Sequence, residues 1–396
     1  MKPDRLVMPG QVWGLAATAS SGPIFVTSYA GHDLDGTVLT AVDPADGVVW
    51  QRSFAGHPGP PRGTSSGTVW VAHAGGTFTE VGVDGSDLRS VVPEHEPHEH
   101  MGAFVVLPDG FCVIWLPGHP YRVVPPGRTA RVARHTWAGG TVWSTPLVLA
   151  EFAFAGADAG WQAQPMEPWR PRTLGAGSRE PLLVSGDRVL AEIADGSSGI
   201  GVCTLLDAAT GRIVTTTPPG PYCHKAITGP GSFLIGRQGY GEFTTTSYDA
   251  TGQALRTWAG HGMMLVDRHG TVRSAELENG SVSRSRFRVL NPDGSVSDGP
   301  LLSGYHTTAP ALDVDGTAVF WRDGQLLAVD AERRIRTLFA EDDDRGVMSR
   351  ILLLDHGQVV FALHDELFVV GGTGLARLDT GPWPCGDGNL GGNPVR

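Results

Sequence analysis

Four histidines stand just before short apolar runs, where the strand that follows would hold each imidazole in place. They are His100 in EHMGAFVV, His224 in CHKAITG, His261 in GHGMMLV and His306 in YHTTAPAL. Imidazole is the commonest protein ligand for Zn, Cu, Fe and Ni, and it exchanges protons near neutral pH. Brought together, these four side chains are candidates to hold a divalent transition metal. Three of them, His224, His261 and His306, are also candidate catalytic bases, with Tyr305 as an acid.

The run EHEPHEH, residues 94–100, is a second candidate because Glu and His alternate around Pro97. Converging Glu and His side chains bind a divalent ion, whereas a solvated loop has the same composition. The four histidines above equally suit a solvent-filled channel in which they bond only to water or backbone carbonyls. The sequence leaves these interpretations open for both groups.

A recurring turn shows which elements must position these residues. A turn rich in Asp and Gly lies between two short apolar runs at Asp43, Asp84, Asp207, Asp249, Asp293, Asp330 and Gly372. Most steps are 37 to 44 residues, and the gap from Asp84 to Asp207 is 123 residues. We interpret this gap as three steps of about 41 residues, with degenerate copies near Pro126 and Glu167. A period of this length is typical of β-propeller blades.

Each period reads as four strands, and the 55 glycines and 29 prolines disfavour long helices. One such sheet has two apolar faces, which radial stacking in a closed ring buries. We therefore predict an all-β fold, a single closed β-propeller of eight or nine four-stranded blades, with nine preferred. The expected units are residues 11–54, 55–93, 94–135, 136–175, 176–220, 221–260, 261–304, 305–344 and 345–381, followed by a Gly-rich tail, 382–396.

Several repeats resemble those of PQQ-like (quinoprotein-type) β-propellers. The segments TAVDPADGVVW, LLDAATGRIV and TAPALDVDGTAVFWRDGQLLAVDA carry the resemblance, and the tail GPWPCGDGNLGGNPVR resembles the PWP…GN segment that accompanies such propellers. The resemblance covers essentially the whole chain. It implies the propeller fold and leaves the function open, because the superfamily includes both dehydrogenases and assembly scaffolds.

The cofactor of true quinoprotein dehydrogenases is not expected here. Their docking pattern, Ala-x-Asp-x-x-Thr-Gly-Lys-x-x-Trp, is approached only around Asp43 and Trp50, where the Thr is missing. The fifth unit has Thr215 where the Trp is expected, and the chain has no adjacent cysteine pair. The resemblance therefore implies an inherited fold without PQQ.

Propeller geometry places most histidines at one face. The connections from a fourth strand to the next blade, and from a second to a third strand, lie at one end of each blade, here called the top end. By the predicted strands, 12 of the 14 histidines fall in these connections, and only His269 and His356 fall at the opposite, bottom end. If this top face captures a partner, exposed aromatic and arginine side chains in its loops are the expected anchors, namely Arg62, Trp137, Arg237 and Tyr240.

Composition excludes several classes of function. The net charge is −11 and only Lys2 and Lys225 are lysines, so the basic stripe of a nucleic-acid-binding protein is missing. The apolar runs are far shorter than the ~18 residues of a membrane span, and no phosphate-binding loop, G-x-S-x-G or H-E-x-x-H motif is present. The start MKPDRLVMPGQVWG lacks the apolar stretch of a signal peptide. We expect a cytoplasmic monomer, unless a signal peptide has been removed.

Two functions remain. The first is a non-catalytic binding or scaffold module that captures a protein, peptide, glycan or small-molecule ligand on the top face. The alternative is an enzyme, a metal-dependent or histidine-based lyase, oxidase or cyclase, that uses the histidines at the mouth of the central channel. The sequence favours the first because it contains no complete catalytic motif.

Overall fold

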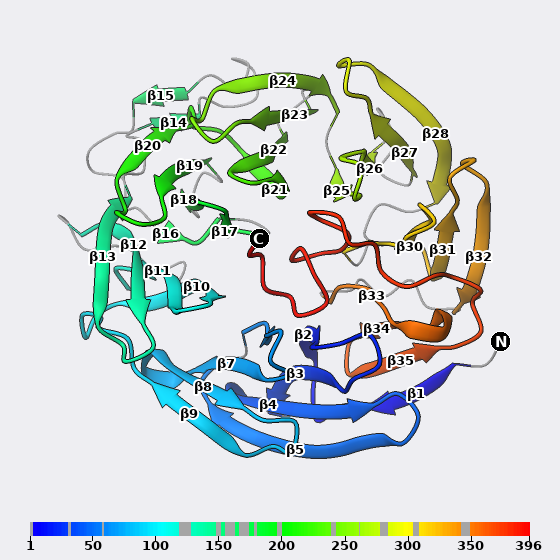
Figure 1. The fold of residues 1–396 in the computed structure, drawn as a ribbon, viewed down its shortest axis with the longest axis horizontal. Helices are drawn as coiled ribbons and strands as arrows, with labels where there is room; N and C mark the ends of the chain where they lie inside the picture. Colours follow the sequence, from blue (N-terminus) through cyan, green and yellow to red (C-terminus); the bar gives the residue numbers. More distant parts are fainter. Residues whose placement is uncertain are drawn as a thin grey trace. The chain divides into compact units, whose positions relative to one another are not determined.

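The structure is a computed structural model, and it describes residues 3–30, 33–57, 59–118, 128–147, 152–154, 163–165, 174–177, 180–195, 200–238, 243–260, 262–277, 284–303, 309–341 and 349–396. Across these residues the chain is all-β and forms an eight-bladed β-propeller of four-stranded antiparallel blades (Figure 1). The chain divides into two compact units. Unit 1 is Met1–Val91, Met263–Pro292 and Val296–Asn393, and unit 2 is Val92–Gly262, Asp293–Ser295 and Pro394–Arg396.

Unit 1 contains blades 1, 2, 6, 7 and 8. Blade 1 is β2 (Val12–Ala17), β3 (Ile24–Ala30), β4 (Asp33–Asp43) and β5 (Gly47–Ala55), and blade 2 is β6 (Arg62–Gly63), β7 (Val69–His73), β8 (Thr77–Val81) and β9 (Asp87–Val91). Blade 6 is β25 (Met263–Val266), β26 (Val272–Leu277), β27 (Arg284–Leu290) and β28 (Val296–Ser303). Blade 7 is β29 (Ala311–Leu312), β30 (Ala318–Arg322), β31 (Gln325–Val329) and β32 (Ile335–Ala340). Blade 8 is β33 (Leu352–Leu353), β34 (Val359–Leu363), β35 (Glu366–Val370) and β1 (Asp4–Val7).

Unit 2 contains blades 3, 4 and 5. Blade 3 is β10 (His100–Leu107), β11 (Gly110–Leu116), β12 (Ala130–Thr136) and β13 (Thr141–Leu147). Blade 4 is β16 (Leu174–Gly175), β17 (Leu182–Ser185), β18 (Arg188–Asp195), β19 (Ile200–Asp207) and β20 (Ile213–Thr216). Blade 5 is β21 (Tyr222–Gly229), β22 (Ser232–Gln238), β23 (Phe243–Tyr248) and β24 (Ala254–Ala259). A separate pair is formed by β14 (Phe152–Phe154) and β15 (Ala163–Pro165).

The preference for nine blades was wrong, because the expected unit 136–175 is not a blade. Its first strand, Thr141–Leu147, is the fourth strand of blade 3, and Leu174–Gly175 pairs with β18 in blade 4. The 123-residue gap therefore holds two blades with longer connections instead of three of ordinary length. The two degenerate copies expected near Pro126 and Glu167 lie outside the described residues.

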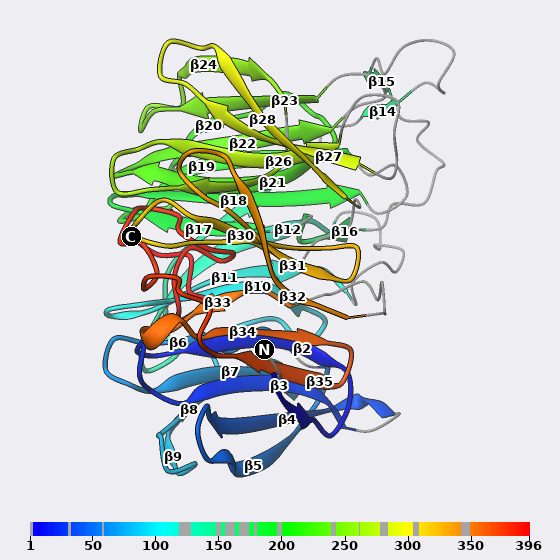
Figure 2. The same cartoon turned by 90° about the vertical axis from the view of Figure 1, so that its right-hand side faces the viewer.

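The last blade is completed by the start of the chain. The expected unit 345–381 supplies three strands, and β1 pairs with β35 as the fourth, with Arg5 opposite Phe368. Figure 2 shows β35 beside β34 and close to the N-terminus. The residues that precede the first repeat thus belong to the last blade. The repeat count from the sequence had assigned these residues to no blade.

The repeated turns form for local reasons. In the β19–β20 hairpin, Asp207 Oδ1 accepts hydrogen bonds from the Thr210 N–H at 2.9 Å and the Thr210 hydroxyl at 2.8 Å. Such bonding between a turn Asp and the backbone is why this residue recurs at third-to-fourth strand hairpins. The tryptophans that share one slot of the second strand, Trp70, Trp115 and Trp321, are at most 2% exposed. They therefore pack in the core.

The C-terminal tail lies against the ends of first strands. In unit 1, Val266 and Trp383 form a β-bridge, and the Leu312 N–H donates to the Pro384 carbonyl at 2.7 Å. The Gly63 N–H donates to the Gly391 carbonyl at 2.7 Å, and a Cβ on Gly63 would lie 2.9 Å from Gly391 Cα, so this approach requires glycine. These contacts lie at the ends of β25, β29 and β6 that lead into first-to-second strand hairpins, which are bottom ends.

In unit 2, the last residues of the chain contact the same end of a first strand. Val395 forms a parallel bridge with Val184 near the end of β17. In both units the tail contacts are therefore at bottom ends, and the top ends carry the connections that the sequence singled out. No helix in the described part of the chain is long and apolar enough to cross a membrane.

Candidate functional site

The structure describes two of the four histidines proposed as metal ligands. His100 is the first residue of β10 and is exposed, and His224 lies in β21 and is partly buried. Both are at the top ends of their blades, as the predicted strands require. The other candidates at this face, His261, Tyr305, His306 and Tyr240, lie outside the described residues.

In blades 1, 3, 4 and 5 the first strand loses its regular pairing near the top end. A register shift falls between Val12 and Gly14 in blade 1, between Met101 and Ala103 in blade 3, and between Tyr222 and Lys225 in blade 5. In blade 4 the first strand is interrupted between β16 and β17, both of which pair with β18. Bulges change the direction of a side chain and are frequent next to functional sites. The short apolar runs between turns predicted the strands but gave no sign of these interruptions.

His224 lies on the bulge of β21 beside Glu180. Its Nδ1 is 3.9 Å from Glu180 Oε2, and the two side chains are 17% and 9% exposed. The same carboxylate oxygen accepts a hydrogen bond from the Lys225 backbone N–H at 3.4 Å. A carboxylate beside one ring nitrogen sets the orientation of an imidazole. Glu180 therefore lies within ion-pair distance of His224, a contact that no motif in the sequence indicated.

Glu180 itself has a strained backbone. Its φ is 52°, a left-handed value that costs a non-glycine residue about 1–3 kcal/mol, and the following Pro181 restricts it further. It lies in the interruption between β16 and β17, where the Glu192 N–H donates to the Pro181 carbonyl at 2.8 Å. Strain of this kind persists where the surroundings enforce it and clusters at functional sites.

A buried ion pair lies directly behind His224. Lys225 Nζ is 2.5 Å from Glu192 Oε2, and the side chains are 0% and 1% exposed. Burial alone would lower the pKa of Lys225, but the Glu192 carboxylate, helped by Glu180, raises it above its ordinary value. A Cβ on Gly201 would lie 2.4 Å from Glu192 Oε1, so any larger residue there would displace the carboxylate from its present position. The pair joins the second strand of blade 4 to the first strand of blade 5.

Arg237, predicted as a binding residue, lies at the same end of blade 5 as His224. It is in β22, directly opposite Tyr222 in the register of β21 and β22. Its guanidinium lies over Gly220, where a Cβ would be 2.8 Å from Arg237 Nε. The fold thus brings two predicted site residues, His224 and Arg237, to the top ends of the first two strands of blade 5.

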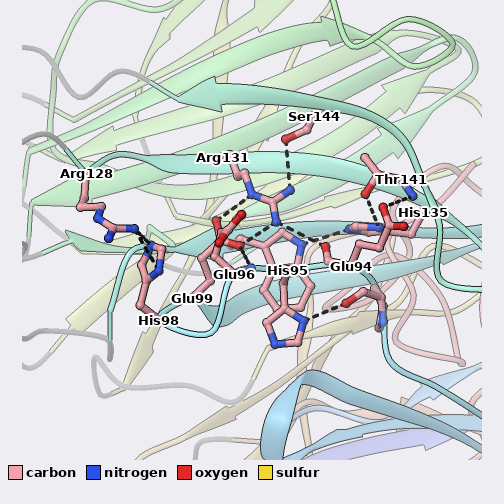
Figure 3. A network of polar contacts seen from close by, with 12 residues as sticks. Glu94, His95, Glu96, His98, Glu99, Arg128, Arg131, His135, Thr141 and Ser144 are labelled. Carbon is pink, nitrogen blue, oxygen red and sulfur yellow. Dashed lines mark hydrogen bonds and ion pairs between the residues drawn. The ribbon is translucent and has the colours of Figure 1, made fainter.

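The run EHEPHEH is a partly exposed segment in this structure, and several of its side chains are engaged by blade 3. It lies along blade 3 and is tied to it at both ends (Figure 3). At the bottom end, Glu94 accepts a hydrogen bond from the Thr141 N–H at 3.0 Å. Toward the top end, Arg131 donates to both carboxylate oxygens of Glu99 at 2.7 Å. Although burial opposes ionisation, Arg131 holds the pKa of Glu99 below its ordinary value.

Between these ties, the segment covers Trp115. The His95 ring stacks on the indole with centroids 4.6 Å apart and planes 5° apart, and the Arg131 guanidinium lies 5.8 Å from the same ring. His95 Nδ1 is 2.8 Å from the Pro93 carbonyl, which fixes its proton on that nitrogen. The glutamates and histidines of the run therefore build a polar packing layer on the face of the blade.

His135 extends this network into the core (Figure 3). The Trp115 Nε1–H donates to His135 Nε2 at 3.1 Å, so the ring proton is on Nδ1, which faces Thr141 Oγ1 at 3.4 Å. Burial, with a contribution from Arg131, lowers the pKa of His135 to about 4. The sequence placed His135 in a connection between blades, but it lies within β12 and is 1% exposed.

No metal-binding constellation is present in the part of the chain that the structure describes. Groups of three or more His, Cys, Asp or Glu side chains with suitable geometry are missing from these residues. The proposed set of His100, His224, His261 and His306 is not tested by this result, because two of its members lie outside the described ranges.

Two of the predicted binding residues do not lie where the sequence placed them. Arg62 is 6% exposed in β6, where it donates to the Gly392 carbonyl of the tail and lies 3.6 Å from Asp387. Trp137 lies in the β12–β13 hairpin, at the bottom end of blade 3, and its Nε1–H donates to the Pro108 carbonyl at 3.2 Å. Arg62 therefore binds the tail, and Trp137 is at the opposite end from the predicted binding face.

An aromatic cluster at the top end of blade 1 was missed. Trp13 is the bulged residue of β2, Tyr29 lies near the end of β3, and His57 follows β5. The Trp13 and His57 ring centroids are 5.2 Å apart, and the Tyr29 hydroxyl is 2.9 Å from His57 Nε2. The sequence grouped histidines only with one another, so it did not associate His57 with these two rings.

Comparison with known proteins supports the architecture. No protein-family model and no curated protein matches the chain, but solved structures do. BamB from Moraxella catarrhalis is 13% identical, with a TM-score of 0.55 over 93% of this chain and 96% of that chain. The Dos1 propeller is 10% identical, with a TM-score of 0.63 over 95% and 96%. This chain has the fold of these propellers. The predicted structural resemblance to PQQ-like propellers is confirmed, and at this identity it concerns the fold alone.

Proposed function

We propose that the protein is a non-catalytic binding module that captures a protein or peptide partner at the top ends of its blades. The observation that carries this proposal is the irregularity of the first strands at those ends in blades 1 and 5, where bulges interrupt the regular pairing of β2 and β21. The tail contacts lie at bottom ends in both units, so a partner meets the top ends without displacing them.

The state of the titratable side chains supports a binding role. His135 is buried and neutral, Lys225 and Glu192 neutralise each other, and Glu99 is held by Arg131. Groups that are engaged in this way stabilise the fold and offer no proton to a substrate. Arg237 remains at the top end as a charged anchor of the type that is enriched in interfaces.

The test is a selection of peptides with the full-length chain, followed by dissociation constants for the selected peptide. We expect Arg237→Ala to weaken binding by about tenfold, which is 1.4 kcal/mol, and the peptide to be recovered chemically unchanged. The matched control is Arg334→Ala, because Arg334 is exposed in the bottom-end hairpin of blade 7. Equal losses in both variants, or conversion of the peptide, would contradict the proposal.

The second candidate is an enzyme that uses His224, and the position of Glu180 beside its Nδ1 favours it. In this alternative His224 acts as a general base. Its test is replacement of His224, His261 and His306 together by alanine, with elemental analysis of the wild-type protein. If the protein is a binding module, we expect the peptide affinity of this variant to stay within about threefold of the wild-type value. Stoichiometric metal in the wild-type protein and loss of an activity in the variant would favour the enzyme.

A further inference from the structure

Arg128 lies just before β12 and differs from the two arginines within that strand. Arg131 is 2.7 Å from the Glu99 carboxylate, and Arg134 is 2.5 Å from the Asp109 carboxylate. Among the residues that the structure describes, no carboxylate lies within ion-pair distance of Arg128. Of these three positive charges, that of Arg128 alone is not neutralised by a described acid.

The group that Arg128 contacts is an imidazole. Its Nη1 lies 2.9 Å from His98 Nδ1 and also contacts Nε2 of the same ring (Figure 3). A guanidinium only donates hydrogen bonds, so the His98 nitrogen that takes the bond carries no proton. Arginine stays protonated in proteins. The contact therefore holds the guanidinium in place and leaves its positive charge intact.

Glu99, the acid next to His98 in the sequence, is already engaged. Its Oε1 accepts a hydrogen bond from Arg131 Nε at 2.7 Å. Its Oε2 accepts from Arg131 Nη2 at 2.7 Å and from the Glu96 backbone N–H at 2.8 Å. Glu99 would lose these three bonds if it turned to Arg128, so an anion that pairs with Arg128 comes from a partner.

We propose that Arg128, positioned by His98, binds the carboxylate of an Asp or Glu side chain of the peptide partner. Arg128 is exposed and His98 is half-buried, and both lie in top-end connections, His98 before β10 and Arg128 before β12. His98 engages Nη1, and the edge formed by Nε and Nη2 is the two-donor fork that binds a carboxylate. The inference rests on the proposed binding function and names the chemical group that the top end of blade 3 recognises.

The charge at this site favours a carboxylate over a phosphate. Because Glu99 neutralises Arg131, Arg128 offers one positive charge, whereas phosphate groups on peptides are bound by clusters of arginines. The net charge of −11 also repels densely anionic partners such as nucleic acids. A peptide that places one acidic side chain at Arg128 meets both conditions.

The experiment selects peptides with the full-length protein from a library held between fixed neutral flanks, so that no free C-terminal carboxylate is offered. We expect one position to be enriched in Asp or Glu. Replacing that acid by its amide should weaken binding about tenfold, as measured by calorimetry. Equal affinity of the acid and amide peptides would overturn the inference. Tighter binding of a peptide with phosphoserine at that position would also overturn it, because the site would then recognise phosphate.

Variants identify the arginine that binds the acid. In Arg128→Gln, an exposed position, the acid and amide peptides should bind equally. The matched control is Arg212→Gln, which replaces an exposed arginine in the bottom-end β19–β20 hairpin and should keep the tenfold difference. A tenfold difference that persists in Arg128→Gln overturns the inference. If selected peptides still bind through Arg237 in that case, the proposed binding function stands without it.

Discussion

The pKa of His135 depends on the environment that the fold gives this side chain. In the folded chain its imidazole is neutral because burial and the Trp115 hydrogen bond disfavour the charged form. The pKa is about 4 when folded and about 6.5 in an unfolded chain. Between these values the unfolded state binds more protons, so this histidine makes the protein less stable as the pH falls from about 6.5 to 4.

The first prediction is therefore a change in pH dependence. We expect the free energy of unfolding of His135→Gln to change less steeply with pH between about 4 and 6.5. The slope should fall by up to about 1.4 kcal/mol per pH unit relative to the wild type, as measured by urea unfolding at several pH values. The control, His269→Gln, replaces an exposed histidine and should keep the wild-type slope. A His135→Gln slope equal to that of the wild type would show that His135 already titrates normally in the folded protein.

The second prediction concerns the buried ion pair. Lys225→Met leaves the Glu192 carboxylate buried without its counter-charge, which typically costs 3–5 kcal/mol. The double variant Lys225→Met, Glu192→Gln removes both charges and should recover at least about 1 kcal/mol of that loss. The measurement is a double-mutant cycle on the free energy of unfolding. Additive losses in the cycle would mean that the two side chains do not stabilise each other.

Residue types alone predicted only part of this chemistry. The sequence identified His224 and Arg237 as candidates, and both lie at the top end of blade 5. It did not predict Glu180, because that residue reaches His224 through an interruption of the first strand. It also did not predict that EHEPHEH packs on blade 3, since its partners Trp115 and Arg131 lie 20 to 37 residues further along the chain.

At the scale of elements, the hairpins were predictable and their irregularities were not. Asp-Gly turns repeat because each forms its own hydrogen bonds locally, so spacing in the sequence found the third-to-fourth strand hairpins. The blade count failed where long connections surround β13 and β16, because a period cannot be followed through inserted segments. Bulges at Trp13 and His224 carry no local signature in the sequence, so these irregular top ends could not be predicted from it.

The contacts of the C-terminal tail lead to a prediction about the free energy of unfolding. Arg350 is 4% exposed and donates hydrogen bonds to the carbonyls of Leu15 and Gly386 at 2.8 and 2.7 Å, and to those of Asn389 and Leu390. Lysine cannot reproduce this planar set of donors. Arg350→Lys should therefore destabilise the protein by about 2–4 kcal/mol, measured by urea unfolding.

Its matched control is Arg334→Lys, an exposed arginine that bridges Asp330 and Glu332. Exposed pairs contribute at most about 1 kcal/mol, so this change should be small. Amide exchange of residues 386–392 should rise in Arg350→Lys and stay unchanged in the control. If both variants have the same stability and the same exchange, Arg350 does not hold the tail.

At the scale of the whole molecule, the bottom ends and the top ends of the blades carry different features within each unit. Within unit 1 the tail and β1 secure the bottom ends and the last blade, and within unit 2 Val395 secures blade 4. Top ends carry the interrupted first strands and the aromatic and charged side chains. The likeness to the BamB and Dos1 propellers extends over nearly the whole chain, so what distinguishes this protein lies in those local features.

Hydrogen–deuterium exchange of the full-length chain with and without a selected peptide tests this division most directly. We expect protection at the starts of the first strands and in the connections next to them, with the peptide recovered unchanged by mass spectrometry. Protection confined to the third-to-fourth strand hairpins and the tail, or a peptide of altered mass, would contradict it.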